Sequence, residues 1–205
     1  MSGMRAALLT TSLALATAVA LGAGVPAAHA APASAPAAHG HAADCRGEGV
    51  DPSARIRYAA DIVIDAPLST VWKLQTDVER WPDWQPAVLT AERLDPGPLR
   101  EGARFRWTTP APSTTLEIAS TVRQLRPGRC VLWSGPAVGK GLRVDDGVHL
   151  WTYEKVRGGV RVHTEETWIG AQVEADVPAA TAALGAGLDA WLRDLKTEAE
   201  AEARG

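Results

Sequence analysis

The sequence predicts an α+β domain in which one curved, antiparallel, seven-stranded sheet wraps around a long C-terminal helix. Three observations lead to this fold class. One strand-like segment opens the folded part, two short helical segments follow, and six further strand-like segments precede a long amphipathic stretch. Strands joined by short hairpins are antiparallel. A single curved sheet must bury one face, and only the terminal helix is long enough to cover it.

The first strand and the two short helices come from the segment that opens the domain. Residues 55–65 alternate apolar and polar side chains, which is typical of a half-buried strand. Pro67 fits the first turn of a short helix that the apolar spacing predicts over residues 68–76. A second short helical or turn segment is expected over residues 78–84, where Pro82 interrupts the pattern.

Six further strands are separated by turn signals rich in Pro, Gly and Asp. The last two form a hairpin around Arg157-Gly158-Gly159. The glycine-rich stretch 135–141 is interpreted as a bend between strands, because it is one residue too short for a phosphate loop and lacks its Ser or Thr. The expected strands cover residues 88–94, 103–109, 114–123, 130–134, 148–156 and 160–169.

The chain ends in a long predicted helix. Asp176 fits its N-cap and Pro178 its first turn. Gly185 and Gly187 lie inside it, where they leave room for a ligand, ease a bend, or mark a helix of poor propensity. Apolar residues at spacings of three and four form one stripe: Leu184, Leu188, Trp191, Leu192 and Leu195.

The N-terminal segment, residues 1–30, has the features of a secretory signal peptide. Arg5 supplies a positive charge, an uncharged apolar run follows, and Ala28-His29-Ala30 forms a small-x-small cleavage site. The run is short and Ala-rich, which disfavours an uncleaved anchor. We therefore expect a secreted protein with no integral membrane segment in the mature chain.

Residues 31–54 are rich in Ala, Pro, Gly and His and are interpreted as a flexible linker, with the folded domain over residues 55–205. Export favours a disulfide between Cys45 and Cys130, which would attach the linker to the domain; a buried free thiol at Cys130 is the alternative. No metal site is expected, since no known structural site has the spacing of His39, His41, Asp44 and Cys45.

Composition narrows the classes of function. Lys and Arg total 21 and Asp and Glu total 24, so a net charge of −3 gives no electrostatic reason to expect nucleic acid as a partner. Eight of the eleven aromatic residues are Trp, a side chain that suits cores with polar corners and the walls of ligand cavities. Neither a nucleophile elbow nor a zinc-binding helix occurs, and no cofactor is expected.

Three motifs resemble the START/SRPBCC superfamily, whose members include polyketide cyclase/dehydrase and lipid-transport proteins. They are the stretch 64–74 continued by Asp77 and Trp81-Pro82-Asp83-Trp84, the strand 102–107, and the run 133–170. The resemblance covers residues 55–200 and implies a helix-grip fold around a hydrophobic ligand cavity. It does not imply one activity, because the superfamily holds enzymes, carriers and stress proteins.

The last hairpin places candidate site residues on one face. With Arg157-Gly158 as the turn, His149 lies opposite Glu166; with Gly158-Gly159, it lies opposite Trp168. In both registers His163 and Glu165 are expected to face solvent.

Trp81 and Trp84 either line the cavity entrance or close the core. The predicted cavity wall consists of Phe105, Trp107, Trp151, Tyr153, Trp168, Leu184, Leu188 and Trp191.

The pair His149 and Glu166 is the only candidate for chemistry. It could act as a general acid and base, orient a bound ligand, or form a satisfied hydrogen bond of the core. The sequence favours a secreted, non-enzymatic protein that binds a small hydrophobic molecule, lipid-like or aromatic. One alternative is a polyketide cyclase/dehydratase-like enzyme that uses this pair. A second is an interaction module whose core is filled and holds no ligand. The sequence does not determine the oligomeric state.

Overall fold

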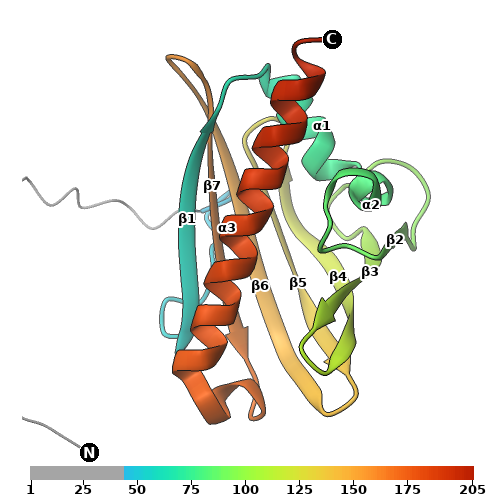
Figure 1. The fold of residues 1–205 in the computed structure, drawn as a ribbon, viewed down its shortest axis with the longest axis vertical. Helices are drawn as coiled ribbons and strands as arrows, with labels where there is room; N and C mark the ends of the chain where they lie inside the picture. Colours follow the sequence, from blue (N-terminus) through green and yellow to red (C-terminus); the bar gives the residue numbers. More distant parts are fainter. Residues whose placement is uncertain (1–43) are drawn as a thin grey trace, which may run out of the picture. The chain divides into compact units, whose positions relative to one another are not determined.

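The structure, a computed structural model, describes residues 44–205 (Figure 1). The predicted signal peptide and residues 31–43 of the predicted linker lie outside these residues. The elements, in chain order, are β1 (Ile56–Ile64), α1 (Leu68–Thr76), the 3-10 helix η1 (Val78–Arg80), α2 (Trp81–Trp84), β2 (Thr90–Arg93), β3 (Arg104–Ala111), β4 (Thr114–Arg126), β5 (Cys130–Gly139), β6 (Leu142–Val156), β7 (Gly159–Ile169), the 3-10 helix η2 (Val173–Asp176) and α3 (Val177–Glu202).

The seven strands form one antiparallel sheet in the order β1-β7-β6-β5-β4-β3-β2. Figure 1 shows the sheet curving behind α3, with α1 and α2 to one side of the helix. The predicted fold class is confirmed: one curved sheet, two short helices after the first strand, and a long terminal helix. The chain joins its first and last strands by pairing β1 with β7.

Strands β5 and β6 are longer than the sequence predicts. The glycine-rich stretch 135–141, expected to be a bend, is mostly strand, and only Lys140 and Gly141 form the turn. A Cβ atom at Gly135 would lie 1.8 Å from the carbonyl oxygen of Ala119, so only glycine allows β4 to approach this closely. The register between β5 and β6 shifts just after this residue, which marks a bulge.

Helix α3 begins as predicted. The Asp176 carboxylate accepts a hydrogen bond from the backbone N–H of Ala179 at 3.0 Å, and Pro178 occupies the first turn. The helix runs alongside β1, where the hydroxyl of Tyr58 donates a hydrogen bond to the carboxylate of Asp189 at 3.1 Å. A Cβ at Gly185 would lie 2.7 Å from the Tyr58 ring, so this glycine makes room for Tyr58.

Two apolar clusters lie between α3 and the concave face of the sheet. The aromatic cluster contains Trp72, Trp81, Trp84, Phe105, Trp107, Trp133, Trp151, Tyr153 and Trp191 with neighbouring aliphatic side chains. The aliphatic cluster contains Ile56, Ala137, Val144, Val173, Leu184 and Leu188, and the half-buried Tyr58, Leu116, Ile118, Leu142, Trp168, Val177 and Ala180. The two clusters occupy different halves of the same face.

A third cluster lies on the convex face. Cys45 and Cys130 form a disulfide there, and Cys45 and Val50 pack with side chains of β5 and β6. Residues 44–54, predicted as part of a flexible linker, therefore contact the sheet. The expectation that Glu165 faces solvent is wrong, because its side chain is only 4% exposed and pairs with Arg57 of the neighbouring strand.

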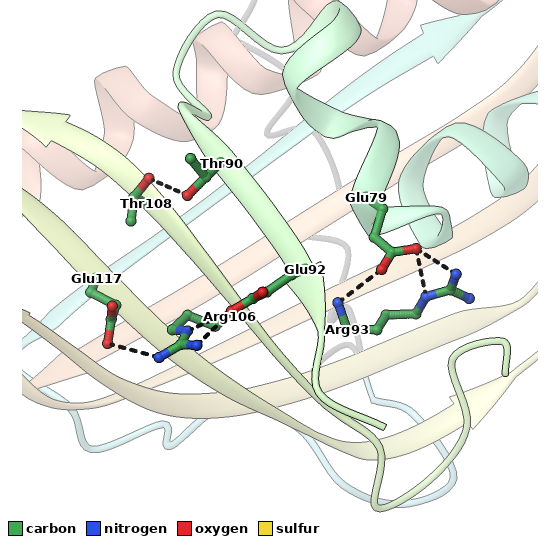
Figure 2. A network of polar contacts seen from close by, with 7 residues as sticks. All are labelled: Glu79, Thr90, Glu92, Arg93, Arg106, Thr108 and Glu117. Carbon is green, nitrogen blue, oxygen red and sulfur yellow. Dashed lines mark hydrogen bonds and ion pairs between the residues drawn. The ribbon is translucent and has the colours of Figure 1, made fainter. Parts of the chain in front are cut away.

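Ion pairs at the protein surface link β2 to the elements beside it (Figure 2). Glu79, in η1, accepts two hydrogen bonds from the guanidinium of Arg93 in β2, one of them at 3.0 Å from Nε. This pair joins η1 and the adjoining α2 to the sheet. Arg106 in β3 bridges Glu92 and Glu117 on the neighbouring strands. Among the helices of residues 44–205, none has the length and apolar character needed to cross a membrane.

Candidate functional site

The site is built on the hairpin of β6 and β7. Arg157 and Gly158 form its turn, so Val156 pairs with Gly159 and His149 lies directly opposite Glu166. This is the first of the two predicted registers. Because side chains alternate along a strand, the same register places Thr164 diagonally across from His149 on the concave face.

A chain of polar contacts joins four side chains of these two strands. The Nδ1 atom of His149 lies 3.2 Å from Oε2 of Glu166, and its Nε2 atom lies 2.8 Å from Oγ1 of Thr164. Trp168 donates from Nε1 to Oε1 of Glu166 at 2.7 Å. Thr164 is fully buried and the His149 side chain is 8% exposed, whereas the Glu166 side chain retains 17% exposure.

Burial shifts both ionisable groups towards their neutral forms. Loss of solvation lowers the pKa of His149 from 6.5 to about 3. It raises the pKa of Glu166 from 4.5 to about 7, against the opposing effect of the Trp168 hydrogen bond. Between about pH 3 and pH 7 the pair is therefore a neutral imidazole beside a protonated carboxyl group.

The pair can carry its proton in two arrangements. A protonated Glu166 donates to Nδ1 of His149, whose Nε2–H then donates to the hydroxyl of Thr164. An ionised Glu166 instead accepts from Nδ1–H, and Thr164 donates to Nε2. Ionisation of one carboxyl group thus reverses every hydrogen bond between Thr164 and Glu166 without moving a side chain.

Hydroxyl, imidazole and carboxylate follow one another here in the order found in serine hydrolases. Thr164 is fully buried, however, and cannot reach a substrate. Glu166 is the more accessible end of the chain of contacts. Its carboxyl group can accept a hydrogen bond when ionised or donate one to a carbonyl oxygen when protonated.

Two residues border Glu166 on the side away from His149. Trp168 donates a hydrogen bond to its carboxylate, and Gly147 lies opposite Trp168 on β6. A Cβ at Gly147 would lie 3.6 Å from Oε1 of Glu166, which is ordinary contact distance. The absence of a side chain at Gly147 therefore leaves space beside the carboxyl group.

The predicted wall residues divide between the two clusters instead of enclosing one space. Trp168, Leu184 and Leu188 belong to the aliphatic cluster, and the other five belong to the aromatic cluster. Within the aromatic cluster the rings contact one another. The ring centroid of Trp191 lies 5.7 Å from that of Trp107 and 6.1 Å from that of Trp151. Aromatic contacts therefore link several of the residues that the sequence predicted as cavity wall.

Trp81 and Trp84 close the core, the second of the two predicted roles. Trp81 is fully buried, and its ring contacts those of Phe105, Trp107, Trp133 and Trp191. Trp84 is 8% exposed and packs against Trp191. The burial of Trp81 favours this role over a place at a cavity entrance, because the segment that carries it packs inward against α3.

Sequence reasoning placed Thr164 on the same face as His149 and Glu166 but missed Trp133 and Gln75. Trp133 is buried beside His149, at a centroid distance of 5.3 Å. Both faces of the sheet are covered at residues 130–133, and all four residues are apolar. Apolar and polar residues therefore do not alternate there, and the sequence does not show which side chains face α3. Gln75 accepts from Nε1 of Trp191 at 3.0 Å, and a polar residue within a short helix carries no sequence signal for this contact.

Several buried donors near Trp191 have no partner within the described residues. They are Nε2 of Gln75 and the indole N–H groups of Trp84 and Trp151. A buried donor without an acceptor costs about 1–3 kcal/mol. The aromatic cluster is therefore densely filled by side chains but incompletely satisfied in hydrogen bonding.

Fold and site together define a helix-grip domain with an ionisable pair on its concave face. The chain belongs to the family described as polyketide cyclase / dehydrase and lipid transport, which matches residues 55–200. Among curated proteins, none matches the sequence at a significant level.

Solved structures confirm the fold. A START superfamily protein from Mycobacterium smegmatis is 11% identical with a TM-score of 0.57, over 70% of this chain and 97% of that one. Ara h 8.0201 is 12% identical with a TM-score of 0.54, over 72% and 96%. The di-domain ARO/CYC StfQ from the steffimycin biosynthetic pathway is 15% identical with a TM-score of 0.59; the match covers 73% of this chain and 52% of that protein.

Proposed function

We propose that this protein binds a small hydrophobic molecule, lipid-like or aromatic, on the concave side of the sheet beside Glu166. One observation carries the proposal. Glu166 is a partly exposed carboxyl group beside the aliphatic cluster, held by His149 and Trp168, and its side chain is 17% exposed. Ligand sites of this kind combine apolar walls with a few fixed polar groups that orient the ligand.

The aliphatic cluster supplies the apolar part of the proposed site. Its members Leu116, Ile118 and Trp168 are half-buried, whereas Trp81 and Trp151 in the aromatic cluster are fully buried. A ligand that covers the half-buried side chains gains about 25 cal/mol for each Å² of apolar surface removed from water. The family description and the biosynthetic origin of the similar StfQ support a lipid-like or polycyclic aromatic ligand.

We also propose that the protein acts outside the cytoplasm. The signal-peptide features of residues 1–30 support export. The disulfide between Cys45 and Cys130 supports an oxidising compartment, because such bonds rarely persist in the cytosol. N-terminal sequencing of the protein from its native source should give Ala31 as the first residue; a chain that retains Arg5 would contradict secretion by cleavage.

Binding can be tested in two stages. Native mass spectrometry of protein from its source should show a retained small molecule, and Trp fluorescence should respond to members of a panel of fatty acids and polycyclic phenols. Gly147→Leu should then weaken binding of a responding compound at least roughly tenfold, because the new side chain fills the space beside Glu166.

Gly187→Leu is the matched control for this substitution. Gly187 lies in α3, and no atom comes within 4 Å of the position that a Cβ would take there, so its replacement leaves the concave face unchanged. Equal affinities of the two folded variants would contradict the location of the site. The absence of both a retained molecule and a fluorescence response would contradict ligand binding itself.

A second candidate, an enzyme, is favoured by one specific observation. The pKa of Glu166 is raised to about 7, which suits a group that both gives and takes a proton near neutral pH. A cyclase/dehydratase-like reaction on an enolisable ketone would need this group. Glu166→Gln should then abolish turnover of aromatic ketones yet leave their binding within a few-fold; equal turnover by the variant would exclude the enzyme.

A further inference from the structure

A separate pocket of about 610 Å³ lies at the end of the sheet where β6 turns into β7 and α1 begins. Figure 1 shows this hairpin and the connection from β1 to α1 at the same end of the molecule. Its lining combines residues from three segments of the chain: Ala66, Pro67, Leu68, Ser69, Trp72, Gly128, Lys155, Val156, Gly159 and Val160.

The pocket is distinct from the surroundings of Glu166. Lys155 lies six residues beyond His149 on β6, which corresponds to a distance of roughly 20 Å along a strand. Trp72, which lines the pocket, packs edge to face against Tyr153 with ring centroids 5.3 Å apart. Tyr153 is a buried member of the aromatic cluster. Packed aromatic side chains thus stand behind this wall of the pocket.

The walls of the pocket are mostly apolar, with one cationic group. Leu68, Trp72, Val156 and Val160 present carbon surface, whereas Lys155 contributes an exposed ammonium group. Within residues 44–205, Lys155 forms no ion pair that would neutralise it. The pocket is open to solvent over much of its extent, so a ligand would lie against its apolar wall with one side exposed.

The two hairpins that carry Gly128 and Gly159 add more positive charge. Arg126 and Arg129 flank Gly128, and Arg157 precedes Gly159; all three are exposed, and none has an ion-pair partner in the described part of the chain. Of the nearby acidic groups, Glu154 pairs with Arg161 and Glu200 pairs with Lys196. Asp65 is the remaining carboxylate beside this end.

We propose that this pocket binds an anionic amphiphile: a molecule with one phosphate or carboxylate group and an alkyl chain or apolar ring. The ammonium group of Lys155 contacts the anionic group, and Leu68, Trp72 and Val160 cover the apolar part. The arginines of the two hairpins raise the local concentration of anions. The protein would therefore have two ligand sites of different charge preference, one at Glu166 and one at Lys155.

Decyl phosphate below its critical micelle concentration tests the proposal by isothermal titration calorimetry. We expect saturable binding that Lys155→Met weakens roughly tenfold, since the variant keeps the apolar stem but loses a charge-assisted contact. Lys140→Met is the matched control, because Lys140 is also an exposed lysine next to a strand end but lies at the turn between β5 and β6 and does not line the pocket. Equal losses in both variants would overturn the proposal.

A second variant tests the pocket itself and not only its charge. Ser69 is exposed and lines the pocket, so Ser69→Trp should obstruct it without disturbing the core and should also weaken decyl phosphate binding. Unchanged binding by this variant would overturn the proposal. Gly147→Leu should leave decyl phosphate binding unchanged, which separates this site from that of the proposed function.

Vesicles of phosphatidylcholine with 30% phosphatidylglycerol, a composition of roughly physiological anionic charge, distinguish a free amphiphile from a lipid in a bilayer. Binding of decyl phosphate, with or without vesicle binding, supports an amphiphile pocket. Vesicle binding that depends on Lys155 but occurs without any decyl phosphate binding would overturn it in favour of a membrane-docking surface. Failure of both probes to bind would overturn it outright.

Discussion

The aromatic and aliphatic clusters share one concave face but fill it differently. In the aromatic cluster, Trp rings contact Trp rings, and Trp81 and Trp151 are fully buried. In the aliphatic cluster, smaller side chains leave Ile118 and Trp168 half-buried. Glu166 contacts Trp168 of this half-covered region, whereas the ring of His149 packs against Trp133 and Trp151 of the aromatic cluster. The difference supports the proposal that the ligand binds over the aliphatic half and not over the aromatic half.

The largest expected effect is on the free energy of unfolding, and it should differ between a Trp of the aromatic cluster and a Trp of the aliphatic cluster. Trp81→Ala should lower the free energy of unfolding by about 4 kcal/mol, because it removes a large side chain from a site that cannot collapse. Trp168→Ala should cost about half as much, since the residue is only half-buried. Urea unfolding of both variants measures the contrast. Equal losses would show that the two halves are packed alike.

The next effect concerns the ionisable pair. The folded pKa of Glu166, about 7, exceeds its ordinary value of 4.5, so this group destabilises the fold progressively as pH rises from 4.5 to 7. The folded pKa of His149, about 3, lies below 6.5, so this group destabilises the fold as pH falls from 6.5 to 3. Between 4.5 and 6.5 the two slopes cancel, and stability should show a plateau.

Glu166→Gln sharpens this prediction, because the amide cannot ionise. Loss of the carboxylate removes a penalty of about 3 kcal/mol above neutral pH, so the variant should be more stable than the native protein at pH 8. At pH 5, where the native carboxyl group is already neutral, the two proteins should differ little. Chemical unfolding at both pH values measures the difference in stability between the two proteins. The same difference at pH 5 and pH 8 would contradict the conclusion that burial keeps Glu166 neutral below pH 7.

A smaller effect tests how tightly the aliphatic cluster is packed where α3 meets β1. Gly187→Ala should stabilise the protein by about 0.5–1 kcal/mol through helix propensity alone. Gly185→Ala should instead destabilise it by about 1 kcal/mol, because the new methyl group overlaps the ring of Tyr58. Thermal unfolding compares the two alanine variants. A gain in both would mean that Tyr58 moves freely and that the cluster is loosely packed at this contact.

The smallest expected effect lies on the convex face. Arg106 bridges Glu92 and Glu117 in the network of Figure 2, but all three side chains are exposed. Exposed pairs are screened by water and salt, so Arg106→Ala should leave the midpoint of thermal unfolding within about 2 °C of the native value. A larger decrease would show that the network, and not the inner clusters, holds the β2 edge.

Periodicity predicted most of the fold because each element meets a different environment on its two sides. The limits of α1 were predicted to the residue, since Pro67 and the apolar spacing define them. The prediction failed where both sides of a strand are covered or where glycines stand in a strand. Residues 130–133 are apolar throughout, which hid Trp133, and the bulge at Gly135 was interpreted as a bend.

The sequence alone determined the family, the strand order along the chain and the face shared by His149 and Glu166, because alternation and hairpin turns are local properties. Only the tertiary structure decided how that face is filled. Whether Trp107, Trp151 and Trp191 enclose a space or contact one another depends on the curvature of the sheet and the position of α3. Both are set by contacts between residues far apart in sequence, which no local pattern encodes.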